Sequence, residues 1–168
     1  MKKKKVLTIV QARTLSHRLP GKVLIPILNK PMILHQLERI SLSELSDTIV
    51  LATSLDSSDD YLSDLVLKNN YNLYRGSLDN VLDRFYQCNQ TYKHDVIVRI
   101  TGDCPLTDPL LIDEMINYFL IGGYDYISNS AKSDELSVPD GFDIEVFSSN
   151  ALFKAFSNAK LASEKEHV

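Results

Sequence analysis

The sequence predicts an α/β fold with a Rossmann-like, mostly parallel sheet covered by helices on both faces. Strand-like and helix-like segments alternate along its 168 residues. Continuous apolar runs at 6–10, 49–52 and 96–100 are typical of parallel strands that are buried on both sides. The repeated strand–helix–strand order places such strands in one doubly wound sheet. Because the sequence shows no repeat, linker or low-complexity tract, we expect one domain over residues 1–168.

The individual elements follow from apolar runs for strands and from apolar residues at helical spacing for helices. Pro31 and Pro109 stand where proline is favoured, in the first turn of a helix, and Gly122-Gly123 ends the second of these helices. An acidic first turn indicates the helix that starts at Asp59. The expected strands cover Lys5–Gln11, Asp47–Thr53, Asn72–Arg75, Asp95–Ile100, Tyr124–Ser128 and Phe142–Phe147. The expected helices cover Pro31–Ser43, Asp59–Lys68, Leu78–Tyr92, Pro109–Leu120 and Ser149–Leu161.

The composition narrows the classes of function. A content of 44% hydrophobic and 24% charged residues is ordinary for a globular protein, and no run reaches the length of a membrane span. The net charge of −4 argues against a general nucleic-acid binder, which normally carries a basic face. The two cysteines, Cys88 and Cys104, have no disulfide-framework or metal-site spacing. We therefore expect a cytoplasmic protein with reduced cysteines.

A cationic loop, from Gln11 to Lys22, follows the first strand. Arg13, Arg18 and Lys22 lie in it together with hydroxyl residues and a Pro-Gly corner. Guanidinium groups fork onto phosphate oxygens, a lysine adds a point charge, and backbone N–H groups add donors. The alternative is an ordinary loop with surface charges. Because ligands of such sheets bind beyond the carboxyl ends of the strands, the position of the loop favours a polyphosphate site.

A second candidate follows a central strand, where Asp103 comes directly after Gly102. Mg²⁺ prefers one or two carboxylates together with phosphate oxygens, so a carboxylate opposite the cationic loop suits a metal ligand. The alternative is a turn or cap residue, which is common after strands. The nearby cationic loop favours the metal ligand.

Two more carboxylates, Asp143 and Glu145, follow the Pro139-Asp140-Gly141 turn and alternate with apolar residues. The alternation predicts that they share one face of a strand. That face either contacts a second metal or the substrate, or is the solvent-exposed face of an edge strand. Asp143 is the better candidate because it lies nearer the turn.

Several polar residues at the ends of other strands are weaker candidates. Thr53 and Ser54 either bind a ligand or complete a local turn. The corner from Arg75 to Asn80 has side chains that could read a base edge, although Ser77 also suits the N-cap of the next helix. His94 is expected on the surface.

Six segments in this order resemble one enzyme family, the cytidylyltransferases that activate acidic sugars. The family includes the CMP-KDO and CMP-acylneuraminate synthetases, and the likeness is greatest to its spore-coat-polysaccharide, SpsF-like branch. The segments are Gln11–Lys22, Asn29–Met32, Ala52–Ser54, Val81–Tyr86, Gly102–Leu106 and Asp140–Phe147. Leu15 departs from the pattern, because family members usually carry glycine there.

The resemblance implies a nucleotide-diphospho-sugar transferase fold and a Mg²⁺-dependent reaction of CTP with an acidic sugar, giving CMP-sugar and pyrophosphate. It also implies a homodimer, for which Tyr124–Phe147 is the expected interface. Relatives continue beyond Val168, so we expect this chain to lack the C-terminal part of the family domain. The alternatives are a nucleotidyltransferase with another base or acceptor, and a catalytically silent module of the same fold.

The resemblance also assigns roles to individual residues. The catalytic residues would be Arg13, Arg18, Lys22 and Asp103. The nucleotide would be bound by Gln11, Ala12, Ser16, Thr53, Ser54, Gly76, Ser77 and Asn80, the last three near the cytosine. Mg²⁺ would be held by Asp103, with Asp143 near the sugar or a second metal.

Overall fold

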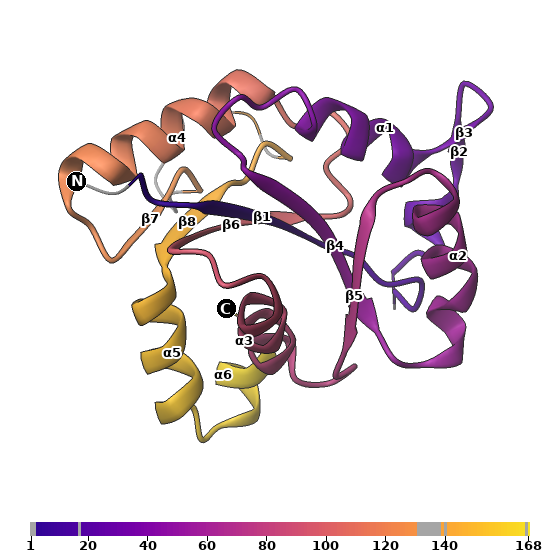
Figure 1. Cartoon of the computed structure of the whole chain (residues 1–168). Helices are drawn as coiled ribbons and strands as arrows, with labels where there is room; N and C mark the ends of the chain where they lie inside the picture. Colours follow the sequence, from indigo (N-terminus) through magenta and orange to yellow (C-terminus); the bar gives the residue numbers. More distant parts are fainter. Residues whose placement is uncertain (1–2, 17, 131–138, 140, 167) are drawn as a thin grey trace.

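A six-stranded mixed sheet forms the centre of the protein (Figure 1). The computed structural model describes residues 3–16, 18–130, 139, 141–166 and 168. The strands stand in the order β5-β4-β1-β6-β8-β7. Their bounds are β1 Val6–Gln11, β4 Thr48–Ser54, β5 Asn72–Gly76, β6 Val96–Thr101, β7 Tyr126–Ser128 and β8 Glu145–Ser148. The predicted α/β fold with a mostly parallel sheet is confirmed.

β1 lies between two parallel neighbours, and its last residue stands level with the last residue of β6. Gln11, the last residue of β1, stands opposite Ala52 of β4 and Thr101 of β6. The loops that follow β1 and β6 therefore leave the sheet at the same edge. The sheet continues beyond β6 with antiparallel pairs, because β8 runs against both β6 and β7.

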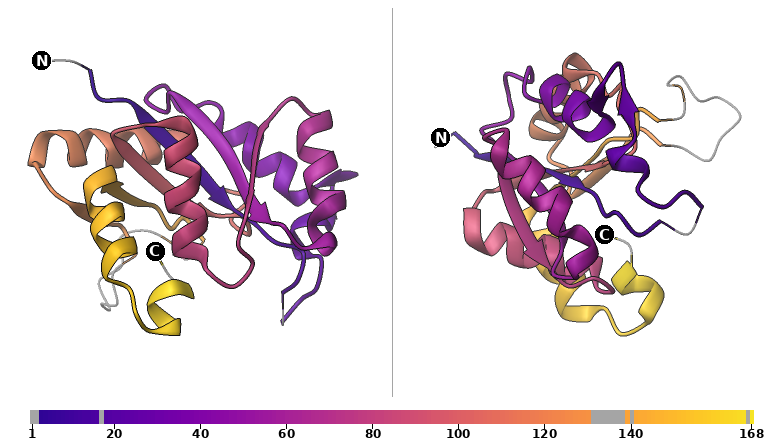
Figure 2. Two further views of the ribbon diagram at one scale, coloured as in Figure 1. Left: turned by 60° about the horizontal axis from the view of Figure 1, so that its bottom comes forward. Right: turned by 90° about the vertical axis from the view of Figure 1, so that its right-hand side faces the viewer.

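Helices cover both faces of the sheet, as predicted (Figures 1 and 2). Alternating strand residues point to opposite sides, so Val10 and Ile100 belong to one apolar cluster and Ile9 and Ile97 to another. The first cluster packs against α1 (Met32–Ile40), α2 (Asp60–Lys68) and α4 (Pro109–Gly122). The second packs against α3 (Val81–Tyr92) and α5 (Ser149–Asn158). The remaining elements are α6 (Ala162–Glu166), the short helices η1 (Lys22–Leu24) and η2 (Ser57–Asp59), and the hairpin strands β2 (Pro26–Ile27) and β3 (Lys30–Pro31).

The start of α3 differs from the prediction because another residue caps it. Asn80 is the N-cap, and its Oδ1 accepts a hydrogen bond from the N–H of Asp83 at 2.9 Å. The Ser77 hydroxyl instead accepts from the N–H of Asn80 at 3.1 Å. The helix therefore begins at Val81, three residues later than its apolar pattern indicates, and the prediction of Ser77 as N-cap is wrong.

Two further predictions are corrected by the packing. Asp143 lies before β8, which begins at Glu145, so the two carboxylates do not share one strand face. Glu145 instead forms an ion pair with Arg99 across the β6–β8 pair, with 2.6 Å between Nη1 and Oε1. His94 is buried rather than on the surface, and its Nε2 lies 3.0 Å from the Thr48 hydroxyl. Asp140, in the expected turn, lies outside the described residues.

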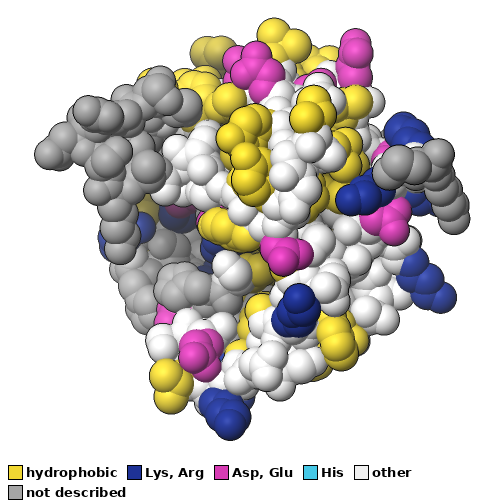
Figure 3. Space-filling view, turned by 90° about the vertical axis from the view of Figure 1, so that its left-hand side faces the viewer, with side chains coloured by type: hydrophobic (Ala, Val, Ile, Leu, Met, Phe, Trp, Pro, Cys, Tyr) yellow, Lys and Arg dark blue, Asp and Glu magenta, His cyan; other side chains and the backbone are white. Residues whose placement is uncertain are grey.

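Aromatic and apolar side chains are exposed where α4 meets β7. Tyr118, Ile121, Tyr124 and Tyr126 are all exposed here, and the rings of Tyr118 and Tyr124 stack with centroids 5.3 Å apart. Figure 3 looks onto this end of the molecule and shows hydrophobic side chains beside scattered acidic and basic ones. Within the described part of the chain, no helix is long and apolar enough to cross a membrane.

Truncation of Ile100 to alanine should remove buried contacts in the central strand β6, where the side chain is fully buried. We expect the free energy of unfolding to fall by about 2–5 kcal/mol, measured by denaturant titration. The matched control is Ile121→Ala on α4, because that isoleucine is 87% exposed. Equal losses for the two variants would contradict the position of the core.

Candidate active site

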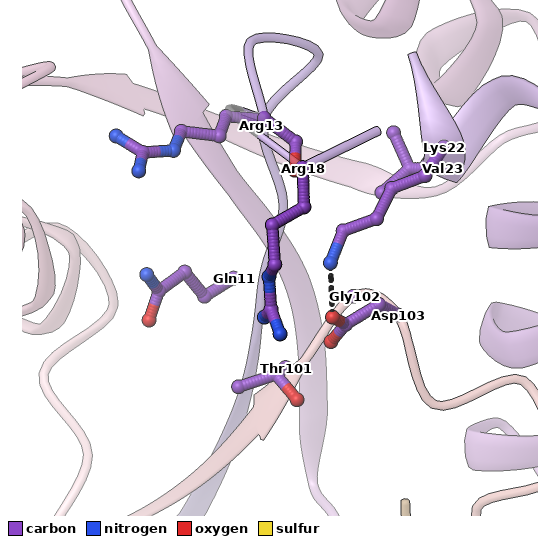
Figure 4. Close-up of a pocket in the computed structure, with 9 residues that line it drawn as sticks. Gln11, Arg13, Arg18, Lys22, Val23, Thr101, Gly102 and Asp103 are labelled. Atoms are coloured by element: carbon purple, nitrogen blue, oxygen red, sulfur yellow. Dashed lines mark hydrogen bonds and ion pairs between the residues drawn. The ribbon is translucent and has the colours of Figure 1, made fainter. Parts of the chain in front are cut away.

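A polar pocket lies at the carboxyl ends of β1 and β6, with a volume of about 270 Å³ (Figure 4). The cationic loop forms one wall and the β6 end forms the other. Its lining residues are Gln11, Arg13, Ser16, Arg18, Lys22, Val23, Thr101, Gly102 and Asp103. The structure thus brings together all four residues that the resemblance makes catalytic. It places them where ligands of open α/β sheets bind.

Positive charge dominates this pocket. Three cations, Arg13, Arg18 and Lys22, line it against one carboxylate, Asp103. Lys22 Nζ forms an ion pair with Asp103 Oδ2, drawn as the dashed line in Figure 4. Neither arginine has an ion-pair partner among the described residues, and the Arg18 guanidinium points into the space between Gln11 and Thr101 (Figure 4). The pocket therefore suits a ligand with several negative charges.

Backbone hydrogen bonds close the cationic loop on itself. The N–H of Gly21 donates to the carbonyl of Thr14 at 2.8 Å, and the N–H of Leu24 donates to the carbonyl of Gly21 at 2.8 Å. Gly21 has a φ of 70°, in the left-handed region that glycine adopts without steric cost. This turn leads directly into η1, whose first residue is Lys22. The Pro-Gly corner thus directs the lysine back toward the sheet edge.

A close approach of two backbones positions Asp103. The N–H of Gly102 donates to the carbonyl of Gln11 at 2.7 Å. A Cβ on Gly102 would lie 2.7 Å from the Cβ of Ala12 and 2.9 Å from the carbonyl oxygen of Gln11, so only glycine fits. Burial raises the pKa of the Asp103 carboxyl, but the hydrogen bond and charge of Lys22 outweigh it and hold the pKa below its usual value.

Other residues with a predicted role in nucleotide binding lie outside this pocket. Ala12 is buried, and its N–H donates to the carbonyl of Ala52 at 3.2 Å. Thr53 and Ser54 are fully buried, and the Ser54 hydroxyl donates to Asp59. Gly76 is also buried, and its carbonyl accepts from the N–H of Leu55 at 2.8 Å. The binding roles of these residues, and of Ser77 and Asn80 in the α3 cap, stay predictions.

A second pocket, of about 470 Å³, adjoins the first and shares Arg13 and Ser16 with it. Its other lining residues are Leu15, Pro20, Leu78 and Asp79. Leu78 and Asp79 lie in the corner from Arg75 to Asn80 that the sequence singled out, but neither was assigned a role of its own. Thr101 lines the first pocket, at the strand end where the rule for open sheets places it, although it was given no role of its own.

The residues predicted to hold metal fit Mg²⁺ in part. Asp103 lines the pocket, and one carboxylate with phosphate oxygens suffices for Mg²⁺. Asp143 is partly buried and does not line this pocket. No cluster of three potential metal-ligating side chains occurs in the described ranges. His17, in the cationic loop, lies outside the described residues.

Replacing Lys22 by methionine should raise the pKa of Asp103, because the ammonium group that stabilises its carboxylate is lost. NMR titration of the Asp103 side-chain carboxyl carbon measures this shift. Lys30→Met is the control, since Lys30 pairs with Glu38 instead. An unchanged pKa in the Lys22 variant would contradict the ion pair.

Comparisons with known proteins find relatives that match nearly the whole of this chain. A protein MJ1063 of Methanocaldococcus jannaschii, described as uncharacterized, is 41% identical over 164 residues, covering 98% of this chain and 65% of that protein. The spore coat polysaccharide biosynthesis protein SpsF of Bacillus subtilis is 36% identical, covering 97% of this chain and 68% of its own. A 3-deoxy-manno-octulosonate cytidylyltransferase of Pelobacter propionicus is 33% identical over 115 residues, covering 68% of this chain and 44% of its own. The chain thus spans about two thirds or less of these relatives.

A solved structure and a family model both identify this chain as similar to cytidylyltransferases. The solved structure of a cytidylyltransferase from Leptospira borgpetersenii superposes with a TM-score of 0.92 at 34% identity, covering 98% of this chain and 69% of that one. The model of the cytidylyltransferase family matches residues 7–168, which include both walls of the pocket. The chain belongs to the cytidylyltransferase family.

Proposed function

We propose that this chain binds CTP with Mg²⁺ and transfers CMP to an acidic sugar, forming CMP-sugar and releasing pyrophosphate. One observation carries the proposal: two arginines without ion-pair partners among the described residues, and one lysine, line a pocket at the carboxyl ends of β1 and β6. A triphosphate would supply the negative charge that is needed to neutralise these three cations. Membership of the cytidylyltransferase family supports CTP as its source.

The chain's own residues act by electrostatics and alignment. The oxygen of a sugar hydroxyl attacks the α-phosphorus and forms a new oxygen–phosphorus bond. The bond to the β-phosphate breaks to release pyrophosphate, and the hydroxyl proton is lost to solvent water. Negative charge grows on the phosphate oxygens during this step, and we expect Arg13, Arg18 and Lys22, which line the pocket, to stabilise it. The hydroxyl of the sugar is the nucleophile, so the protein has to hold two reactants in line.

Asp103 is the residue that would hold Mg²⁺, which when bound would neutralise phosphate charge. Its present partner is Lys22. Binding of the metal and triphosphate would exchange this ion pair for two new contacts, one from Asp103 to the metal and one from Lys22 to a phosphate oxygen. The ion pair keeps both side chains at the pocket before substrate arrives.

The names of two relatives support the kind of sugar acceptor, and exposed aromatic side chains support a dimer. The Pelobacter relative is named for an acidic sugar, and the Bacillus relative is named for polysaccharide biosynthesis, which supports an acidic sugar for a cell-surface glycan. The exposed aromatic residues Tyr118, Tyr124 and Tyr126 support a homodimer that uses the α4–β7 end.

We propose that the transfer of CMP takes place in the cytoplasm, where CTP is available.

Calorimetric titration of CTP tests the proposal, with ATP, GTP and UTP as controls and each nucleotide measured with and without Mg²⁺. We expect Mg²⁺-dependent binding that is selective for CTP. A folded protein that binds no nucleotide triphosphate would contradict the proposal. Equal binding of all four would support the same fold with another base or acceptor.

Substitution of Arg18 by alanine should weaken CTP binding about tenfold or more, because a hydrogen bond between charged groups contributes about 1.5–3 kcal/mol. The same titration measures the loss. Lys68→Ala is the matched control, since Lys68 is exposed in the last turn of α2, away from the pocket. Equal losses in both variants would show that net charge, rather than this pocket, attracts the nucleotide.

A further inference from the structure

Asp59 is a fully buried carboxylate that contacts the cationic loop at Thr14. Its Oδ1 accepts two hydrogen bonds from Thr14, one from the backbone N–H at 2.7 Å and one from the hydroxyl at 2.6 Å. Its Oδ2 accepts two from Ser54, from the N–H at 3.1 Å and from the hydroxyl. One side chain thus joins the loop after β1 to the end of β4.

The anchored residue, Thr14, controls the path of the loop. It lies between Arg13 and Ser16, both of which line the candidate pocket. Its carbonyl also accepts the hydrogen bond from Gly21 that closes the loop, at 2.8 Å. Fixing Thr14 therefore fixes both arms of the loop, including the arm that continues to Lys22.

Burial of a charge requires compensation, and the structure supplies it. Burial raises the pKa of Asp59, but the hydrogen bonds from Ser54 and Thr14 outweigh it, so the pKa lies below its usual value and the group is ionised at neutral pH. The charge of Asp59 also acts on a buried cation, Arg84. Burial and the charge of Arg13 lower the pKa of Arg84 to about 10, while the charge of Asp59 opposes this.

Arg84 also contacts the segment that leads to the adjoining pocket, because Ser77 directly precedes Leu78, which lines that pocket. Its Nη1 donates to the carbonyl of Ser77 at 2.6 Å, while its Nε and Nη2 have no hydrogen-bond partner among the described residues. The charge of this guanidinium is therefore incompletely paired by local acceptors. The negative charge of Asp59 favours the charged form of this guanidinium, although the two side chains form no ion pair among the described residues.

We infer that Asp59 is a positioning residue for substrate binding, whose buried carboxylate holds the cationic loop in the shape that binds a triphosphate. It touches no ligand itself, since it lines neither of the two pockets at the loop. Asp59 acts through Thr14 on Arg13 and Ser16. This role rests on the proposed function of the pocket.

The test compares Asp59→Asn with Asp64→Asn, which removes an exposed carboxylate from the same helical region. Two quantities are measured: amide hydrogen exchange in the free protein, and the dissociation constant of CTP with Mg²⁺. We expect Asp59→Asn to speed exchange at Thr14 and Gly21 and to weaken CTP binding, each about tenfold or more. Exchange at Val98 in β6 should be unchanged, which shows that the sheet remains intact.

Thr14 provides a milder pair of variants if Asp59→Asn does not fold. Thr14→Val removes the hydroxyl that lies within hydrogen-bond distance of Asp59 Oδ1 and the Ser58 carbonyl, and it should weaken CTP binding about threefold or more. Thr14→Ser retains this hydroxyl and should bind like wild type. Equal affinity in the valine and serine variants would overturn the inference.

The outcomes separate this inference from the function on which it rests. Faster loop exchange with unchanged CTP affinity would overturn the positioning role, and so would unchanged loop exchange in Asp59→Asn. Failure of the wild-type protein to bind CTP would overturn the proposed function, and with it any role in substrate positioning. That result differs from the other outcomes because it is observed in the wild-type protein, before any substitution is made.

Discussion

The parallel pairing of β1 with β4 and β6 is the constraint on which the rest of the structure depends. The registers of both pairs place Gln11, Ala52 and Thr101 side by side at one edge of the sheet. The loop after β1 and the Gly102-Asp103 turn after β6 can then face each other. A shift of one residue in the β1–β6 register would turn the residues of one strand to the opposite face and separate Lys22 from Asp103.

The pocket combines an excess of positive charge with a loop backbone that is held by hydrogen bonds. The close contact of Gly102 with Gln11 and Ala12 fixes the carboxylate side, and the turn at Gly21 fixes the lysine side. Buried hydrogen bonds from Thr14 and Ser54 to Asp59 support the loop from behind. Electrostatic stabilisation is effective when charged groups are held in place before substrate binds, and this arrangement provides that preorganisation.

Much of the fold could be predicted because its signals are local. Apolar runs gave the central strands, and Pro109 with the glycine pair gave the ends of α4 to within two residues. The cap of α3 was misplaced because Ser77 and Asn80 are both good cap residues, and only the three-dimensional path of the chain decides between them. The ion pair of Glu145 with Arg99 depends on the antiparallel β6–β8 register, which no local pattern specifies.

In the candidate site, too, residues in short local segments could be predicted, whereas contacts between distant residues could not. Arg13, Arg18, Lys22 and Asp103 could be proposed from two short segments at strand ends. Asp59 could not be found in that way, because its sequence context is an ordinary acidic helix start, and its contact with Thr14 joins residues 45 positions apart. His94 was misplaced for a similar reason, since its partner Thr48 is 46 positions away.

The most direct measurement is NMR mapping of amide shifts while CTP with Mg²⁺ is added to the ¹⁵N-labelled protein. Binding at the cationic pocket predicts the largest changes in residues 11–22 and 101–103, which contain the lining residues of its two walls. A different polar cleft lies among Asn89, Lys93, His94 and Ser149, and it shares no lining residue with the candidate site. The largest changes around that cleft, or none in the cationic loop, would contradict the account.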